Sequence, residues 1–116
     1  MPLFDRPRTR PVAPVFGVLV ETEEGVLRIL AYGELDMSAA AVLEDAFAES
    51  LHEQPPAIVL DLTRLTFLDA GGARTLHGLV GRAARSDVPL SIHGPVGAPR
   101  RVLELTGISA LLALQD

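Results

Sequence analysis

The sequence predicts an α/β domain, with helices packed on one mixed sheet of four to five strands. Short apolar segments alternate with segments whose apolar residues recur at steps of three and four, which is typical of strands alternating with amphipathic helices. One short segment, residues 57–62, is apolar at nearly every position, as expected of a parallel strand covered on both faces. A chain of 116 residues suffices for one such domain and not for two.

The first half of the domain is predicted to begin with a hairpin and a helix. Residues 15–20 and 26–32 have the composition of two strands, joined by an acidic turn in which Gly25 supplies backbone freedom. Residues 33–36 should break the second strand. We expect Ser38 to be the N-cap of an amphipathic helix of about thirteen residues, because a hydroxyl there accepts from first-turn amides.

The second half is predicted to begin its helix after the turn at residues 69–72. The residues expected on the buried stripe of that helix are Leu76, Leu79, Val80 and Ala83. Residues 88–92 resemble another short strand. Pro99 is expected at the first position of a third helix and Gly107 just past its end. Residues 108–114 are predicted to be either a last strand or a short helix.

The composition excludes several kinds of chemistry. The chain has no cysteine, which excludes disulfides, a thiolate nucleophile and a zinc ribbon. All ten cationic residues are arginine, so there is no lysine for a Schiff base or a Walker-type phosphate site. The net charge of −5 argues against a nucleic-acid duplex as the main partner.

The remaining polar residues show no catalytic or metal-binding pattern. His52, His77 and His93 lack the spacing of metal ligands. The pair Gly71-Gly72 is too common to indicate a nucleotide site, and no G-x-S-x-G motif occurs. We therefore expect a protein that is not an enzyme and that holds no metal or cofactor.

The N-terminal segment differs from the rest of the chain. Residues 1–14 contain four prolines and three arginines and are expected to form a flexible leader, with residues 15–116 as the single domain. The segment has no apolar stretch typical of a secretory signal, and no part of the chain has 18 consecutive apolar residues. We expect a cytoplasmic protein without membrane insertion.

Four segments together resemble the STAS domain family of anti-sigma factor antagonists. The main one runs from Val59-Leu60-Asp61-Leu62-Thr63 through Phe67-Leu68-Asp69-Ala70-Gly71-Gly72. Gly33-Glu34-Leu35-Asp36, Pro89-Leu90 and the run from Arg101 to Gly107 agree with the family in order and spacing. The resemblance covers roughly residues 15 to 116 and implies the STAS fold.

The resemblance implies a bacterial partner-switching regulator. In that family the unphosphorylated domain binds an anti-sigma factor that is also a serine kinase of the Bergerat fold, and so releases a sigma factor. The kinase phosphorylates a serine at the start of the second helix. A helix N-terminus tolerates a phosphate because its free N–H groups and partial positive charge favour anions, while the added negative charge disfavours a docked partner.

The chain departs from the family at this serine. Ala70 and Gly71 stand where the family has two serines, and Gly71 corresponds to the phosphorylated one, so this position has no hydroxyl to modify. Thr75, Thr66 and Ser38 are the nearest substitutes. Their ordinary interpretations are a helix-surface residue, a loop hydroxyl and a cap.

The resemblance also indicates which residues contact the partner. They are Asp36, Met37, Ser38, Asp69, Ala70, Gly71, Gly72, Arg74, Thr75 and His77. Independently of the family, Asp69 is expected to be the N-cap or a first-turn acid of the second helix. An alternative function is a STAS interaction subunit of a transporter or stress-signalling assembly. A homodimer formed through an exposed strand edge also stays open.

Overall fold

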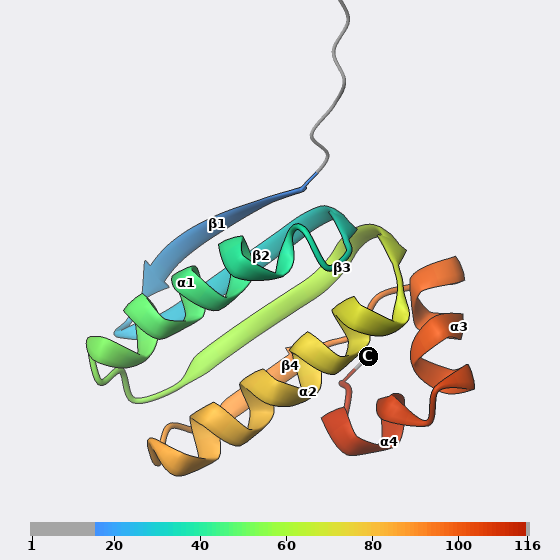
Figure 1. Cartoon of the computed structure of the whole chain (residues 1–116). Coiled ribbons are helices and arrows are strands. Elements are labelled where there is room, and N and C mark those ends of the chain that lie inside the picture. The colour runs from blue at the N-terminus through green and yellow to red at the C-terminus, as the bar shows by residue number, and fades with distance from the viewer. Residues whose placement is uncertain (1–15, 116) are drawn as a thin grey trace, which may run out of the picture.

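The computed structural model describes residues 16–115, so the leader predicted for residues 1–14 lies outside them. Four strands form one sheet, and Figure 1 shows α1 and α2 side by side on one of its faces. In chain order the elements are β1 (Phe16–Glu23), β2 (Val26–Leu35), α1 (Ala40–His52), β3 (Ile58–Leu68), α2 (Ala70–Arg85), β4 (Leu90–His93), α3 (Gly97–Leu105) and α4 (Ile108–Leu112). The predicted mixed sheet with packed helices is confirmed.

The sheet has the order β1-β2-β3-β4. β1 pairs antiparallel with β2, whereas β2 with β3 and β3 with β4 are parallel. Parallel neighbours need a crossover, and α1 and α2 provide the two crossovers. β2 and β3 carry the chain into these helices. Their C-terminal ends therefore lie at the same end of the sheet, where α1 and α2 begin.

The hairpin is longer than the sequence indicated. β1 continues through the acidic residues to Glu23, which pairs with Val26. The turn is only Glu24-Gly25, and both residues have positive φ, 55° and 84°, as a two-residue hairpin turn requires. Strand pairing therefore overrode the low strand propensity of the glutamates.

β2 and β3 also extend beyond their predicted ends. Residues 33–36 do not break β2, which runs to Leu35, because Gly33 adopts a φ of 93° at an irregularity in the pairing. β3 runs to Leu68 instead of ending at residue 62. Between Leu30 and Leu35 the pairing with β3 shifts register twice, and each shift adds one residue to β3.

The core lies between the sheet and the helices and is almost entirely aliphatic. In β2, Leu27, Ile29 and Ala31 are buried and alternate with residues on the other face. The largest side chains that are fully buried are Phe47, Ile29, Leu35, Leu43, Ile58, Leu60, Leu62, Leu76, Leu79, Ile92, Leu103 and Pro95. The stripe predicted for the second helix is confirmed, except that Val80 is only partly buried.

The end of the chain closes the β4 side of the sheet. α3 begins at Gly97, so Pro99 is its third residue and not its first, although it still lies in the first turn, where its missing N–H is tolerated. Gly107 ends α3 with a φ of 77°, as predicted. Residues 108–112 form the short helix α4, and Gln115 beyond it bridges to His93. Within residues 16–115 no helix is long and apolar enough to cross a membrane.

Asp61 holds the first irregularity of β3 in place. Its side chain forms an ion pair with Arg28 on β2 and accepts hydrogen bonds from the backbone N–H (2.9 Å) and the hydroxyl (2.6 Å) of Thr63. Asp61 is only 6% exposed. Burial alone would raise the pKa of Asp61, but the bonds from Thr63 and the charge of Arg28 outweigh it and lower the pKa below its ordinary value.

We expect Asp61→Asn to destabilise the fold at neutral pH by roughly 1–3 kcal/mol, because Arg28 and Thr63 lose a charged acceptor. Because the pKa of Asp61 is lower in the folded state, the unfolded chain binds more protons in acid. The stabilisation that the Asp61 carboxylate provides to the wild type is therefore lost as the pH falls from about 5 through the lowered pKa. Urea unfolding from about pH 7 to 2 should therefore give a flatter profile for the variant. Parallel profiles would mean that Asp61 has no role in acid stability.

Candidate functional site

The turn between β2 and α1 is organised by Asp36. Its Oδ1 accepts hydrogen bonds from the backbone N–H of Ala39 (2.9 Å) and from the hydroxyl of Ser38 (2.7 Å). The bond from the Ser38 hydroxyl is the largest cause that lowers the pKa of Asp36 below its ordinary value, followed by the bond from the Ala39 N–H. The prediction that Ser38 is the N-cap is wrong: Ala39 occupies that position without a side-chain bond, and Ser38 serves Asp36 instead.

Asp69 begins α2 as predicted. Its backbone is extended, its Oδ1 accepts from the N–H of Gly72 (2.7 Å), and its carbonyl accepts from the N–H of Ala73 (2.9 Å). The helix therefore begins at Ala70 and not after Gly72. The sequence pattern placed the start too late because two adjacent glycines are uncommon inside a helix.

Gly72 brings the start of α2 against the end of β2. A Cβ atom at this position would overlap the carbonyl oxygen of Leu35 and lie 2.7 Å from a methyl carbon of Leu68. Only glycine allows this close approach. Gly72 was predicted to contact a partner, but it is buried and therefore supports the surface from beneath.

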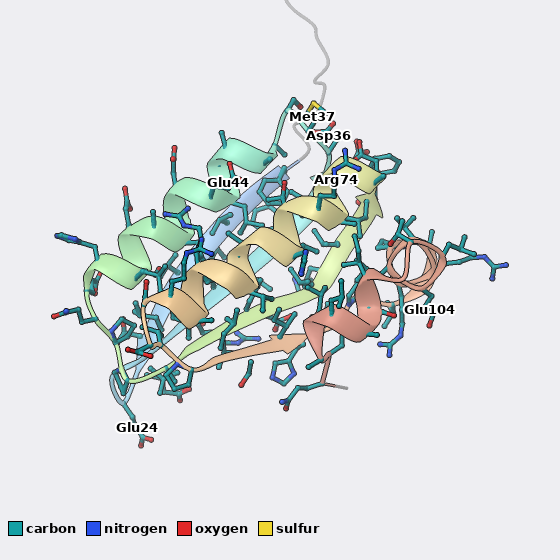
Figure 2. The ribbon with its side chains drawn as sticks, turned by 60° about the horizontal axis from the view of Figure 1, so that its bottom comes forward. Glu24, Asp36, Met37, Glu44, Arg74 and Glu104 are labelled. Atoms are coloured by element: carbon teal, nitrogen blue, oxygen red, sulfur yellow. The ribbon has the colours of Figure 1, made fainter. Side chains whose placement is uncertain are left out.

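Gly71, in contrast, has room for a side chain. A Cβ atom there would lie 3.4 Å from Oδ1 of Asp69 and 3.7 Å from Cβ and Cε of Met37, which are ordinary contacts. Met37 itself is 72% exposed. The turn after β2 and the start of α2 thus meet at Gly71, and Figure 2 shows Asp36, Met37 and Arg74 together at this end of the molecule.

The other predicted residues lie along α2. Ala70, Arg74 and His77 are exposed and share one helix face by their spacing. Thr75 is half-buried, and its hydroxyl donates to the carbonyl of Gly71 at 3.1 Å. Below, "docking surface" means the set without Gly72: Asp36, Met37, Ser38, Asp69, Ala70, Gly71, Arg74, Thr75 and His77.

Phe67 lies at the end of the sheet where the docking surface is located, and it was not among the contact residues predicted from the sequence. Phe67 is exposed, and in the sheet it pairs with Glu34 of β2, close to where α1 and α2 begin. A large apolar residue two positions before Asp69 is the feature of the sequence that could have identified it. It was overlooked because β3 was predicted to end at residue 62.

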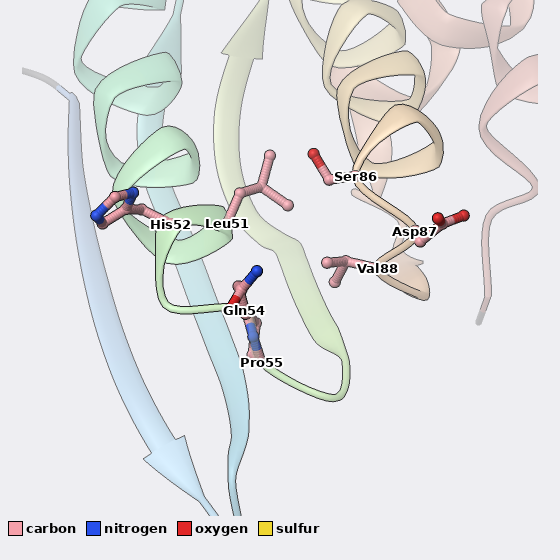
Figure 3. A pocket seen from close by; sticks show the side chains of 7 residues that line it. All are labelled: Leu51, His52, Gln54, Pro55, Ser86, Asp87 and Val88. Carbon is pink, nitrogen blue, oxygen red and sulfur yellow. The ribbon is translucent and has the colours of Figure 1, made fainter.

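A cleft lies elsewhere, at the C-terminal ends of α1 and α2. It has a volume of about 720 Å³ and is lined by Leu51, His52, Gln54, Pro55, Ser86, Asp87 and Val88. Figure 3 shows His52 and Asp87 on opposite sides of this cleft, with Ser86 between them. These three side chains therefore do not converge as a catalytic serine, histidine and aspartate would.

Metal-binding residues do not cluster in the part of the chain that the structure describes: no three histidine or acidic side chains there are placed to hold an ion. Phosphorylation of Thr66 or Ser38 would take place on exposed residues, whereas the hydroxyl of Thr75 is already bonded to the helix backbone.

The comparisons with known proteins agree with this fold. The family model described as "Mlab, STAS domain" matches residues 18–114. The chain belongs to the STAS domain family. It is 30% identical over 97 residues to the anti-sigma-F factor antagonist RsfB of Mycobacterium tuberculosis, covering 84% of this chain and 79% of that protein.

Solved structures show the same architecture. An anti-sigma factor antagonist from Mycobacterium paratuberculosis has a TM-score of 0.76 at 29% identity, covering 87% of this chain and 86% of that one. The unphosphorylated form of the anti-sigma factor antagonist SpoIIAA has a TM-score of 0.66 at 18% identity, covering 86% of this chain and 89% of that one. At this lower identity the second likeness concerns the fold alone.

The packing at Gly72 gives a direct test. We expect Gly72→Ala to lower the free energy of unfolding by about 1–3 kcal/mol, because the added methyl group overlaps the Leu35 carbonyl. The matched control is Gly78→Ala on the same helix, where a Cβ meets no atom within 4 Å. That control should instead stabilise the protein by about 0.5–1 kcal/mol through helix propensity. Equal effects in urea unfolding would contradict the close approach.

Proposed function

We propose that this chain is a non-enzymatic anti-sigma factor antagonist that docks on a kinase-type anti-sigma factor of the Bergerat fold and so controls sigma-factor-dependent transcription. The similarity to RsfB and to the antagonist from M. paratuberculosis supports the class of partner. The observation that carries the location is the exposed Met37 beside Gly71, where two separate chain segments meet on one surface.

The chemistry of the docking surface supports protein binding. An exposed methionine in the middle of a patch adapts to an apolar pocket, and polar groups around it supply orientation. The carboxylates of Asp36 and Asp69 are held by backbone N–H groups, so the turns that carry the surface are already ordered before a partner arrives. A preorganised surface loses less entropy on binding.

The absence of a hydroxyl at Gly71 determines how such a protein is regulated. A kinase has nothing to modify at this position, so phosphorylation there does not release the partner. We therefore infer that binding is constitutive, or is controlled by protein abundance or by another partner. The same absence favours the second candidate, a STAS subunit that stays docked on a transporter ATPase or a stress-signalling scaffold.

We expect Met37→Glu to weaken binding to the cognate anti-sigma factor at least tenfold, about 1.4 kcal/mol, because a charge replaces the apolar centre. Leu105→Glu is the matched control, since Leu105 is a similarly exposed aliphatic residue (76%) at the far end of α3. Isothermal titration calorimetry should show the loss for the first variant only. If the two variants bind equally well, the docking surface is placed wrongly. If the wild type binds no kinase-type anti-sigma factor, the proposed function fails.

Gly71→Ser tests the lost switch. The space around Gly71 admits the side chain, so the variant should fold and bind. With a kinase-type anti-sigma factor and ATP, mass spectrometry should find one phosphate on the introduced serine of the variant and none on the wild type. Phosphate on Thr75, Thr66 or Ser38 of the wild type would show that the switch has moved and is not lost.

A further inference from the structure

The two edges of the sheet are treated differently by the fold. On the β4 side, the N–H of Gln115 donates to the carbonyl of Ile92 (2.8 Å) and the N–H of Gly94 donates to the carbonyl of Gln115 (3.2 Å). The end of the chain thus covers the end of a strand that is only four residues long. On the other side, β1 is the outermost strand and its eight residues pair only with β2 in the part of the chain that is described.

β1 lacks several features that keep an edge strand from pairing, and its only charged residues, Glu21 and Glu23, lie toward its C-terminal end. It contains no proline and no cationic residue, and its register with β2 is regular over all eight residues. At its centre, Leu19 is 52% and Val20 47% exposed. Their side chains point to opposite faces of the sheet, so the strand offers apolar surface on both.

We propose that β1 pairs antiparallel with β1 of a second copy of this chain, joining two four-stranded sheets into one of eight strands. In a two-fold arrangement with all helices on the same face, a residue pairs directly only with one on its own face. Two registers then remain near the centre, with either Leu19 or Val20 opposite itself.

The sequence of β1 selects the register centred on Leu19. That register places Val18 opposite Val20, Gly17 opposite Glu21, and Phe16 opposite Thr22 of the second copy. The central pairs, Leu19 with Leu19 and Val18 with Val20, then join apolar residues, and no glutamate faces another. The alternative centred on Val20 would place Leu19 opposite Glu21, which is a poorer cross-strand pair.

The pairing leaves the docking surface accessible. The turn of residues 36–38 follows the end of β2, one strand in from β1, and α2 packs over β3, two strands in from β1 (Figure 1). A dimer of this kind would therefore present two docking surfaces on one rigid sheet. Its formation needs no partner protein, so its test is independent of the proposed function.

The absence of cysteine from the chain allows a clean cross-linking test. In Leu19→Cys, the two introduced thiols face each other across the two-fold axis, with Cα atoms about 5 Å apart, which suits a disulfide. In the matched control Val20→Cys, the same residues are offset by two positions and lie roughly 8 Å apart, which is too far. Under mild oxidation we expect disulfide-linked dimer from the first variant at no less than about tenfold the rate of the second.

Sedimentation equilibrium of the wild type provides the second measurement. We expect the mass to rise from 12.3 kDa toward twice that value with increasing concentration. Added salt should strengthen the association, because each copy carries a net charge of −5 and salt screens the repulsion. Leu19→Lys should weaken it at least about tenfold by placing like charges opposite each other. A monomer mass at every concentration, or equal cross-linking of the two cysteine variants, would overturn the proposal.

Discussion

The contact between Gly72 and the carbonyl of Leu35 fixes the geometry on which the rest of the docking surface depends. It sets α2 directly against the end of β2, and the chain that leaves β2 then forms the turn with Met37. The start of α2 and this turn come from separate parts of the sequence. They meet because no side chain separates helix from strand at this point. Gly71, one residue earlier, is free of this constraint, and its lack of a hydroxyl therefore has no structural cause in the described residues.

The two register shifts in the pairing of β3 with β2 contribute to this contact. β3 uses two more residues than β2 to reach the same edge, and the side chain of Asp61 holds the first of the extra residues through Thr63. The ion pair with Arg28 ties that bend to the neighbouring strand. A carboxylate in a nearly apolar strand thus contributes to where Asp69 and α2 begin. It also couples the placement of the site to acid stability.

The sequence predicted most of the elements because their periodicity is strong. The thirteen-residue α1, the buried stripe of α2 and the stop at Gly107 follow directly from spacing and local residue types. The ends of β1, β2 and β3 could not be predicted, since pairing with a neighbour, and not propensity, extends Glu23, Leu35 and Leu68 into the sheet.

For the site, the resemblance indicated segments but could not separate buried from exposed residues within them. Gly71 and Gly72 are adjacent and identical in sequence. Only their surroundings show that the first lies at the surface and the second packs beneath it. Ser38 was mistaken for a cap because Asp36, two residues earlier, satisfies the helix start through an interaction that depends on the turn's conformation. Burial and hydrogen-bond partners of this kind follow only from the three-dimensional structure.

The most direct test of the docking surface is hydrogen–deuterium exchange of this protein with and without its cognate anti-sigma factor. We expect slower exchange in the complex at residues 36–38 and 69–77, with little change at the cleft lined by residues 51, 52, 54, 55 and 86–88. Protection at that cleft, with none around Met37 and Gly71, would contradict this expectation.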